Sequence, residues 1–190
     1  LALEAVMSDG RIIRTGSRAR KSSAGYDLTK LLVGSEGTLG IITELTLKLQ
    51  GRPEAISSAI CAFPNINSAV NTVISTIQGG IPIARMEFVD SKSIDVINAY
   101  SKENITPQPY LFMEFHGSES SVKEQVNFVE DLASEFKATN FIWSTKEEER
   151  KKLWWMRHNA FYAYKAFYPN CSVIATDVCV PISKLAEIVD

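Results

Sequence analysis

Three glycines stand at every third position of this chain, at Gly34, Gly37 and Gly40, within residues 34–43 (GSEGTLGIIT). Glycine adopts positive φ angles and lets another group approach the backbone closely. The spacing therefore predicts a loop that lies against a neighbouring strand or against a flat or anionic ligand, with a mononucleotide or dinucleotide as the first candidate. From the spacing alone, the structural explanation and the cofactor explanation both stay open.

The glycine stretch departs from two nucleotide-binding patterns. A Rossmann fingerprint reads Gly-x-Gly-x-x-Gly after a strand and opens a helix, whereas these glycines have another spacing and precede a strand. That strand is predicted by residues 41–50, where apolar odd positions alternate with mostly polar even positions, which is typical of a half-buried strand. A Walker-type phosphate loop is excluded because no Gly-Lys-Ser/Thr follows the glycines.

The composition is that of an ordinary globular protein, with 45% hydrophobic and 22% charged residues among 190. The net charge of -2 provides no whole-chain attraction to nucleic acid or to a membrane surface. No apolar stretch approaches the roughly 18 residues of a transmembrane helix. Cys61, Cys171 and Cys179 are too few and too scattered for a disulfide framework or a zinc site, so we expect reduced, mostly buried thiols.

A breaker cluster at residues 51–54 (GRPE) predicts a domain boundary, with one domain over 1–52 and another over 53–190. The first domain is expected to contain a hairpin with a two-residue turn at 9–10, a short helix near 27–32 and the glycine stretch. The chain opens without methionine inside a predicted strand, so we expect a fragment of a longer protein.

The second domain alternates strand and helix patterns and predicts an α+β fold. Strands are expected at 56–63, 83–89, 110–116 and 141–143, and helices at 65–78, 91–102 and 121–136. Two β-α-β units in tandem are typical of the split β-α-β, or ferredoxin-like, arrangement with helices on one face of the sheet. Beyond them the pattern predicts one extra long helix over 146–167 and a strand over 172–180.

Several segments carry a resemblance to a known family. Residues 21–28 (KSSAGYDL) and 34–43 resemble the end of the FAD-binding domain of the FAD-linked oxidases, the PCMH-type or vanillyl-alcohol-oxidase-like flavoproteins. The later segments narrow the resemblance to the branch of FAD-dependent D-lactate dehydrogenases of the cytochrome type. These segments are 85–88 (RMEF), 114–117 (EFHG), 153–160 (LWWMRHNA) and 177–182 (DVCVPI). The resemblance covers nearly the whole chain. It implies that 1–52 is the C-terminal part of a PCMH-type FAD-binding domain and that 53–190 is a substrate or cap domain, incomplete at its C-terminus.

The same resemblance implies an activity for the full-length protein. The reaction would be oxidation of a D-2-hydroxy acid, D-lactate to pyruvate first of all, by hydride transfer to FAD. Electrons would pass to an acceptor protein, either a cytochrome or an electron-transfer flavoprotein. Glycolate and D-2-hydroxyglutarate are the alternative substrates, and a non-enzymatic α/β ligand-binding module is the alternative from another class.

The resemblance also limits what this chain is expected to do alone. The pyrophosphate-binding loop of the family would lie upstream and its metal-binding and base histidines downstream, so the fragment is expected to be inactive. The resemblance allows a divalent metal in the full-length protein through residues outside this chain, and none within it. An intracellular location, cytoplasmic or mitochondrial, is compatible with it.

The predicted long helix holds the candidate substrate site. Trp154, Arg157 and Phe161 stand at i, i+3 and i+7 and are expected to share a face. A guanidinium between aromatic walls suits a small carboxylate, which it can bind through two parallel hydrogen bonds. An ion pair with the acidic residues 147–149 is the simpler explanation from the residues alone. The resemblance assigns Arg157 to the substrate carboxylate, and the large ring of Phe161 then favours a short acid. His158 belongs to the same candidate pocket, although a capping or core-edge role is the simpler one.

The resemblance places FAD beside the glycine stretch and the basic loop that precedes it. The residues it assigns to the cofactor are Lys21, Ser35, Glu36, Gly37, Gly40, Ile41 and Ile42. From the residues alone, Lys21 together with Arg18 and Arg20 is equally a solvated charged run. That run is too short and too poor in aromatic residues to indicate nucleic-acid binding.

One charged pair is expected to be structural. Arg85 alternates with Glu87 on one face of a predicted strand, and we expect Arg85 to form an ion pair with Glu114 across strands. His116 ends the strand that carries Glu114 and is expected at a solvated loop. The two histidines of the chain lie too far apart in sequence to suggest a metal site.

Overall fold

The computed structural model describes residues 1–19, 21–102 and 104–189, so Arg20 of the predicted basic loop lies outside the described residues. The chain divides into two compact units, Leu1–Arg52 and Pro53–Asp190. The division falls within the Gly- and Pro-containing stretch 51–54, where no regular element forms until the next strand begins. Each unit has its own sheet.

The first unit is a small antiparallel sheet with the strand order β2-β1-β3. Its elements are β1 (Ala2–Val6), β2 (Ile12–Gly16), α1 (Leu28–Leu32) and β3 (Ile41–Thr46). The helix begins at Asp27, whose carboxylate accepts a hydrogen bond from the Lys30 backbone N–H. Leu3, Ala5 and Leu32 form the buried core of this unit.

The hairpin between β1 and β2 differs from the predicted two-residue turn. The Met7 N–H donates to the Arg11 carbonyl at 2.8 Å, which leaves three residues in the loop. Gly10 ends that loop with φ of +83°, the left-handed conformation that a three-residue hairpin requires. The predicted turn was therefore one residue too short, although the glycine was placed correctly.

The predicted half-buried strand at 41–50 is wrong in its burial. β3 forms, but it stops at Thr46, and its apolar side chains are exposed, with Ile41 63% and Leu45 55% accessible. A strand buries one face only where a second layer covers it. In this unit the buried core consists of three side chains and does not extend over β3.

The three glycines of the opening pattern have two different structural roles. Gly34 and Gly37 adopt φ of +83° and +81°, a backbone conformation that residues other than glycine adopt at a cost of about 1–2 kcal/mol. Gly40 permits a close strand approach, because a Cβ atom there would lie 2.9 Å from the Val6 carbonyl oxygen of β1. Turn conformation and strand crossing thus account for all three positions, and the cofactor explanation needs support of another kind.

The second unit is built on a four-stranded antiparallel sheet with the order β5-β6-β4-β7. The strands are β4 (Ala55–Ala62), β5 (Arg85–Val89), β6 (Tyr110–Gly117) and β7 (Thr139–Ser144). In chain order this arrangement reads second, third, first, fourth, which is the strand order of the split β-α-β fold. The predicted α+β, ferredoxin-like architecture is confirmed, with one additional helix between β5 and β6.

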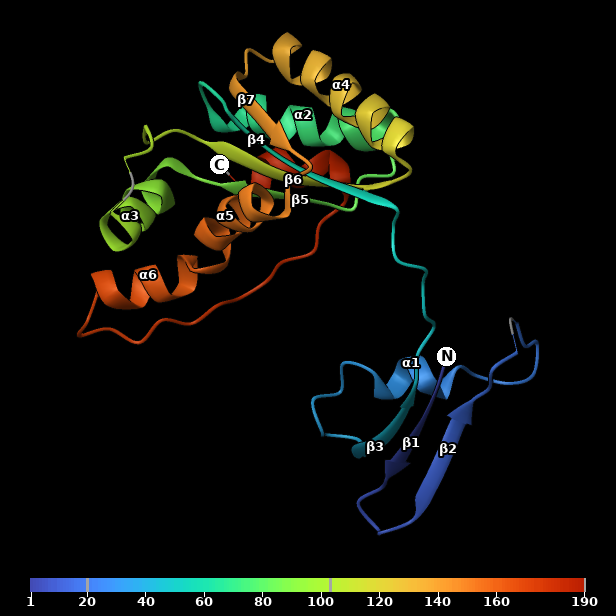
Figure 1. The fold of residues 1–190 in the computed structure, drawn as a ribbon. Coiled ribbons are helices and arrows are strands. Elements are labelled where there is room, and N and C mark those ends of the chain that lie inside the picture. Colours follow the sequence, from blue (N-terminus) through green and yellow to red (C-terminus); the bar gives the residue numbers. More distant parts are fainter. Residues whose placement is uncertain (20, 103, 190) are drawn as a thin grey trace. The chain divides into compact units, whose positions relative to one another are not determined.

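Helices cover both faces of this sheet, not one face alone as the split β-α-β pattern predicted (Figure 1). On one face lie α2 (Ile66–Gln78) and α4 (Glu119–Glu135), which begin at the capping side chains of Asn65 and Ser118. Against the other face pack α5 (Glu147–His158), α3 (Ser91–Ser101) and α6 (Ala160–Phe167). Because successive strand residues point to opposite faces, Leu111 of β6 joins the core under α2 and α4, whereas Phe112 joins the core under α5.

The predicted single helix over 146–167 is wrong. α5 ends at His158 and α6 begins at Ala160, with Asn159 between them at φ -87° and ψ 1°. The Asn159 side chain donates from Nδ2 to the Trp155 carbonyl at 2.9 Å, the same carbonyl that accepts the Asn159 backbone N–H. An asparagine side chain that competes for a helix carbonyl in this way bends or ends the helix.

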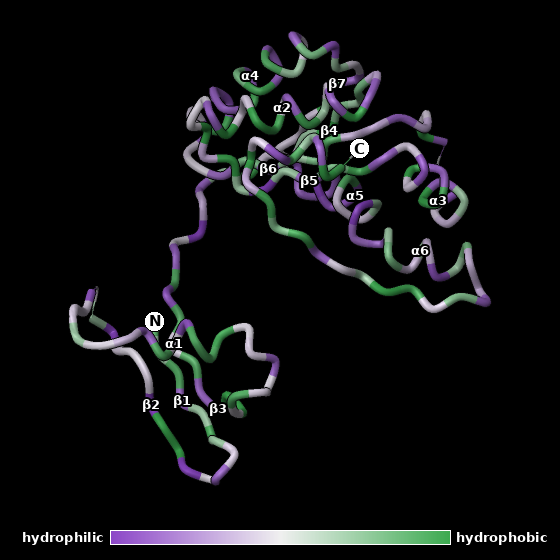
Figure 2. The backbone as a smooth tube through the Cα atoms, turned by 180° about the vertical axis from the view of Figure 1, so that it is seen from behind, coloured by the Kyte–Doolittle hydropathy of each residue, from purple (hydrophilic) through white to green (hydrophobic). Residues whose placement is uncertain are grey.

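The predicted strand at 172–180 is also wrong. These residues form no regular element, and the chain continues into η1 (Ile182–Lys184) and α7 (Leu185–Val189). The connection after α6 carries hydrophobic residues along its exposed course (green in Figure 2), among them Ile174 and Val178. Alternating residues become a strand only when a neighbouring strand accepts their hydrogen bonds, and no described strand pairs with this segment.

The cysteines give a test of the core under α2 and α4. Cys61 lies within that core, and burial raises the pKa of its thiol to about 12, whereas Cys171 and Cys179 are exposed. The expectation of mostly buried thiols therefore holds for Cys61 alone. Because the thiolate is the reactive form, a chromogenic disulfide reagent at about pH 8 should titrate two thiols of the folded chain and three after denaturation. Rapid reaction of three thiols under native conditions would contradict the position of Cys61.

Candidate active site on the α5 face of the sheet

Strand alternation gathers polar side chains on the side of the four-stranded sheet that α5 covers. We call this set the α5 face; its members are Ser58 of β4, Arg85 and Glu87 of β5, and Glu114 and His116 of β6. Each lies an even number of residues from an inward-facing member of the apolar core beneath α5, such as Ile60, Val89 or Phe112. A polar group at such a place is stable only when it is hydrogen-bonded or paired.

Glu114 is the centre of the α5 face. Its side chain is 8% exposed, and both carboxylate oxygens accept from Arg85 Nη2, at 3.0 and 3.1 Å. Arg85 and Glu114 are directly opposite in the β5–β6 register, so the backbone pairing itself brings the charges together. The predicted cross-strand ion pair is confirmed.

His116 is a second partner of the same carboxylate and not only a strand-end residue. Its Nε2 lies 2.8 Å from Glu114 Oε1, and it donates this hydrogen bond when the carboxylate is ionised, because a carboxylate can only accept. Burial alone would raise the pKa of Glu114, but the hydrogen bonds from His116 and Arg85 outweigh burial and hold that pKa below its ordinary value of 4.5.

Trp154 fixes α5 onto this cluster. Its Nε1 donates to Ser58 Oγ at 2.9 Å, and Ser58 Oγ in turn lies 3.4 Å from Glu114 Oε2. The guanidinium carbon of Arg85 stands 4.0 Å from the centre of a Trp154 ring, a cation–π contact. His158 also stacks on Trp154, with ring centres 5.7 Å apart. Two of the predicted pocket residues, Trp154 and His158, are therefore in direct contact.

Arg157 lies one turn further along α5 and pairs with Glu87, not with the acidic residues 147–149. Its Nε is 2.7 Å from Glu87 Oε2, although the N–H direction does not meet hydrogen-bond geometry, so the contact is an ion pair. Arg157 also lines a cavity of about 370 Å³, a size that admits a small ligand. The other lining residues are Phe88, Val89, Asp90, Ser93, Ala160 and Val189.

The predicted common face of Trp154, Arg157 and Phe161 is interrupted at Asn159. Trp154 and Arg157 belong to α5, whereas Phe161 belongs to α6, is exposed and meets Tyr162 edge to face at 5.7 Å. Neither Trp154 nor Phe161 lines the cavity beside Arg157. Ser58 was not among the predicted site residues; its only signal is the pair of adjacent serines, Ser57 and Ser58, within an otherwise apolar strand.

The predicted cofactor segment lies in the first unit and is largely exposed. Lys21, Glu36 and Gly37 are exposed, as are Ile41 and Ile42, whereas Ser35 is half-buried and Gly40 is buried against β1. Glu36 itself adopts φ of +48°, an uncommon backbone conformation for a residue with a side chain. No described heavy atom outside Gly34 and its two chain neighbours lies within 4 Å of the position where a Cβ of Gly34 would stand, as is also true of Gly10, Gly25, Gly51 and Gly80.

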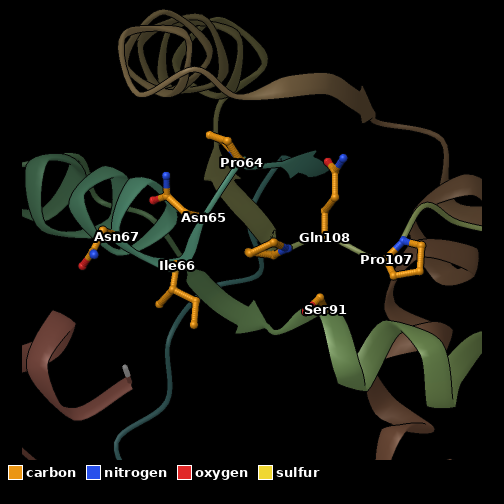
Figure 3. Close-up of a pocket in the computed structure, with 8 residues that line it drawn as sticks. Pro64, Asn65, Ile66, Asn67, Ser91, Pro107 and Gln108 are labelled. Atoms are coloured by element: carbon orange, nitrogen blue, oxygen red, sulfur yellow. The ribbon is translucent and has the colours of Figure 1, made fainter.

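A second cavity of the second unit has a different character. It lies where α2 and α3 begin, with Asn65 and Ser91 on its two sides (Figure 3). Its lining consists of Pro64, Asn65, Ile66, Asn67, Ser91, Pro107, Gln108 and Pro109. None of the predicted site residues belongs to it, so we assign it no role in the chemistry.

Two further searches concern only the described parts of the chain. Within residues 1–19, 21–102 and 104–189, no group of three or more His, Cys, Asp or Glu side chains is arranged to hold a metal ion. No helix in these same ranges is long and apolar enough to cross a bilayer.

The Glu114 cluster leads to a prediction on stability. Glu114→Gln removes the charge that pairs with Arg85 and should lower the free energy of unfolding by about 1–3 kcal/mol at neutral pH. Because folding lowers the pKa of Glu114, its contribution is complete above the ordinary pKa and is lost as the pH falls through the folded value. The difference between wild type and variant should therefore shrink below about pH 4, measured by urea denaturation across pH. A pH-independent difference would contradict an ionised, paired Glu114.

Comparison with known proteins agrees with this architecture. The family described as FAD linked oxidases, C-terminal domain, matches residues 52–190. Two solved structures share the fold at low sequence identity. An alkyldihydroxyacetonephosphate synthase has a TM-score of 0.64 and 18% identity, over 90% of this chain and 34% of its own. The 4-ethylphenol oxidase from Gulosibacter chungangensis has a TM-score of 0.63 and 16% identity, over 89% of this chain and 40% of its own.

Sequence relatives are more similar. A probable mitochondrial D-lactate dehydrogenase of Danio rerio is 48% identical over 100% of this chain and 39% of its own length. The mitochondrial D-lactate dehydrogenase (cytochrome) of Arabidopsis thaliana is 42% identical over 100% of this chain and 33% of its own. Glycolate oxidase subunit GlcD of Bacillus subtilis is 36% identical over 100% of this chain and 40% of its own.

This chain thus spans two fifths or less of each of these relatives. The family match covers most of the chain. It includes the whole split β-α-β sheet and the helices that pack on it. The chain belongs to the FAD-linked oxidases, and residues 52–190 are a C-terminal domain of that family.

Proposed function

We propose that the longer protein to which this chain belongs is an FAD-dependent dehydrogenase of D-2-hydroxy acids, with D-lactate as substrate and pyruvate as product. The observation that carries this proposal is the Arg157 guanidinium at the edge of a cavity of about 370 Å³. Its volume has room for a small acid, and the charge of Arg157 suits a carboxylate. The names of the relatives from Danio rerio and Arabidopsis thaliana support the choice of substrate.

In this proposal the two units have different tasks. Residues 1–52 are the C-terminal part of the FAD-binding domain, and residues 53–190 are the substrate domain. Ser35, Glu36 and Gly37 with Ile41 and Ile42 would line the cofactor, and Lys21 would lie near its phosphates. Gly40 would contribute indirectly, since its close contact with Val6 sets the course of the loop. FAD, when bound, supplies the redox chemistry by accepting a hydride from C2 of the substrate.

The residues of α5 would bind and orient the substrate. Arg157 would hold the carboxylate and so fix one end of a short acid. Trp154 and His158 would act as a rigid support, because Trp154 is anchored to Ser58 and contacts both Arg85 and His158. Phe161 would restrict the length of the acid once the remaining part of the protein surrounds α6.

Electron transfer and location follow the same relatives. We propose a cytochrome as the electron acceptor, ahead of an electron-transfer flavoprotein, and a mitochondrial setting. The support is that the Arabidopsis thaliana relative carries both words, cytochrome and mitochondrial, in its name. A divalent metal would be bound by residues outside this chain. Glycolate is the second candidate substrate, which the Bacillus subtilis relative supports.

The activity can be tested by colour. Full-length protein should be purified yellow, with a flavin absorbance that bleaches when D-lactate is added without an electron acceptor, because the flavin then keeps the electrons. L-lactate is the matched control and should leave the absorbance unchanged. Bleaching by glycolate or D-2-hydroxyglutarate in preference to D-lactate would change the substrate, and a colourless folded protein would favour a ligand-binding module.

The role of Arg157 can be tested by kinetics. Arg157→Ala in the full-length enzyme should raise the KM for D-lactate about 10–100-fold, since a hydrogen bond to a charged group contributes about 1.5–3 kcal/mol. Lys151→Ala is the control, because Lys151 lies on the same helix and makes an exposed ion pair with Glu147. Equal kinetics of wild type and Arg157→Ala would remove Arg157 from the substrate site.

A further inference from the structure

We infer that Glu87 is a positioning residue for Arg157: it holds the guanidinium by its Nε side and leaves the two terminal nitrogens available to the substrate carboxylate. This inference rests on the proposed function and assigns a role to a residue that the sequence pattern left without one. Glu87 would not touch the substrate and would act only through Arg157.

The contact geometry supports this division of the guanidinium. Glu87 Oε2 lies 2.7 Å from Arg157 Nε, an ion-pair contact in which the Nε N–H is not aligned for a hydrogen bond. Within residues 1–19, 21–102 and 104–189, Glu87 is the one carboxylate in an ion pair with Arg157, and Nη1 and Nη2 have no hydrogen-bond partner there. The two terminal nitrogens are the pair that a guanidinium offers for parallel hydrogen bonds to a carboxylate. Arg157 therefore pairs with Glu87 at Nε and keeps Nη1 and Nη2 for a ligand.

Glu87 is itself held in place. It lies in the middle of β5, opposite Phe112 in the β5–β6 register, and Phe112 belongs to the apolar core beneath α5. α5 is anchored independently by the hydrogen bond from Trp154 to Ser58. Both ends of the Glu87–Arg157 contact thus belong to regular elements that are held by contacts of their own, which favours holding a flexible arginine in one orientation.

The position of Arg157 explains why it needs support. Its side chain is 37% exposed, and an exposed arginine otherwise samples many rotamers that a ligand must restrict on binding. A carboxylate already in contact with Nε restricts them beforehand. The neighbouring ion pair of Arg85 and Glu114 has a different geometry, because there a terminal nitrogen, Nη2 of Arg85, donates to both oxygens of the carboxylate.

The negative charge of Glu87 has the opposite effect, because it repels the substrate carboxylate. Glu87 is 30% exposed, so solvent screens this repulsion. The two effects predict opposite signs when the charge is removed. Loss of positioning weakens substrate binding, whereas loss of repulsion strengthens it.

Glu87→Gln in the full-length, FAD-loaded enzyme decides between them. We expect the KM for D-lactate and the Kd for oxalate each to rise about 3–10-fold. Oxalate is a carboxylate that does not react, and its binding is measured by the change it causes in the flavin absorbance. kcat should stay within about twofold, because Glu87 acts on binding and not on the reacting atoms. Glu87→Asp, which keeps the charge on a shorter side chain, should give an intermediate rise. Glu147→Gln, which removes an exposed acid from α5, is the matched control and should change neither constant.

A double-mutant cycle separates positioning from general destabilisation. In the Arg157→Ala background, Glu87→Gln should have no further effect on the Kd for oxalate, because its effect passes through Arg157. An unchanged or lowered KM in Glu87→Gln, or an equal effect with and without Arg157, overturns the inference. Should Glu87→Gln fail to fold, Glu87→Asp in the same cycle gives the answer. If Arg157→Ala itself leaves the KM unchanged, the proposed function of Arg157 fails, and not the inference alone.

Discussion

The pairing of the buried Glu114 carboxylate with Arg85 is the interaction on which the arrangement of the second unit depends. A lone carboxylate at this depth in the sheet would be too costly to ionise, and the register of β5 against β6 supplies its partner directly. The indole of Trp154 in turn contacts the Arg85 guanidinium of this pair and donates a hydrogen bond to the neighbouring Ser58. The helix that carries Arg157 is therefore located by a buried charge as well as by apolar packing.

Much of this fold follows from patterns within single elements. Alternation predicted the four strands of the second unit, and the 3.6-residue period predicted α2, α3 and α4. The Arg85–Glu114 pair was predictable because both residues lie on strands that were recognised. What the patterns missed depends on contacts between elements. The bend at Asn159 arises from one side chain competing for a carbonyl, and the 172–180 segment alternates without a strand to pair with.

The candidate site shows the same division. The family resemblance assigned Arg157 to the substrate carboxylate, whereas the residues alone favoured an ion pair, and spacing within one helix says nothing about what lies opposite. Glu87 belongs to another element, β5, and only the packing of α5 against the sheet brings its carboxylate within 2.7 Å of Arg157 Nε. Likewise the exposed face of β3 could not be foreseen, because alternation predicts which side chains share a face and not whether a second layer covers it.

β5 has a hydrogen-bonded neighbour on one side only, since it ends the order β5-β6-β4-β7 among the described strands. Arg85 and Glu87 both belong to this strand, so the two ion pairs beneath α5 share one mechanical support. An edge strand frays more readily than a central one because half of its backbone groups lack a strand partner. Any segment that pairs with the free side of β5 would stiffen both ion pairs together. Pairing at this edge of the sheet would therefore change how firmly the Arg157 guanidinium of α5 is held.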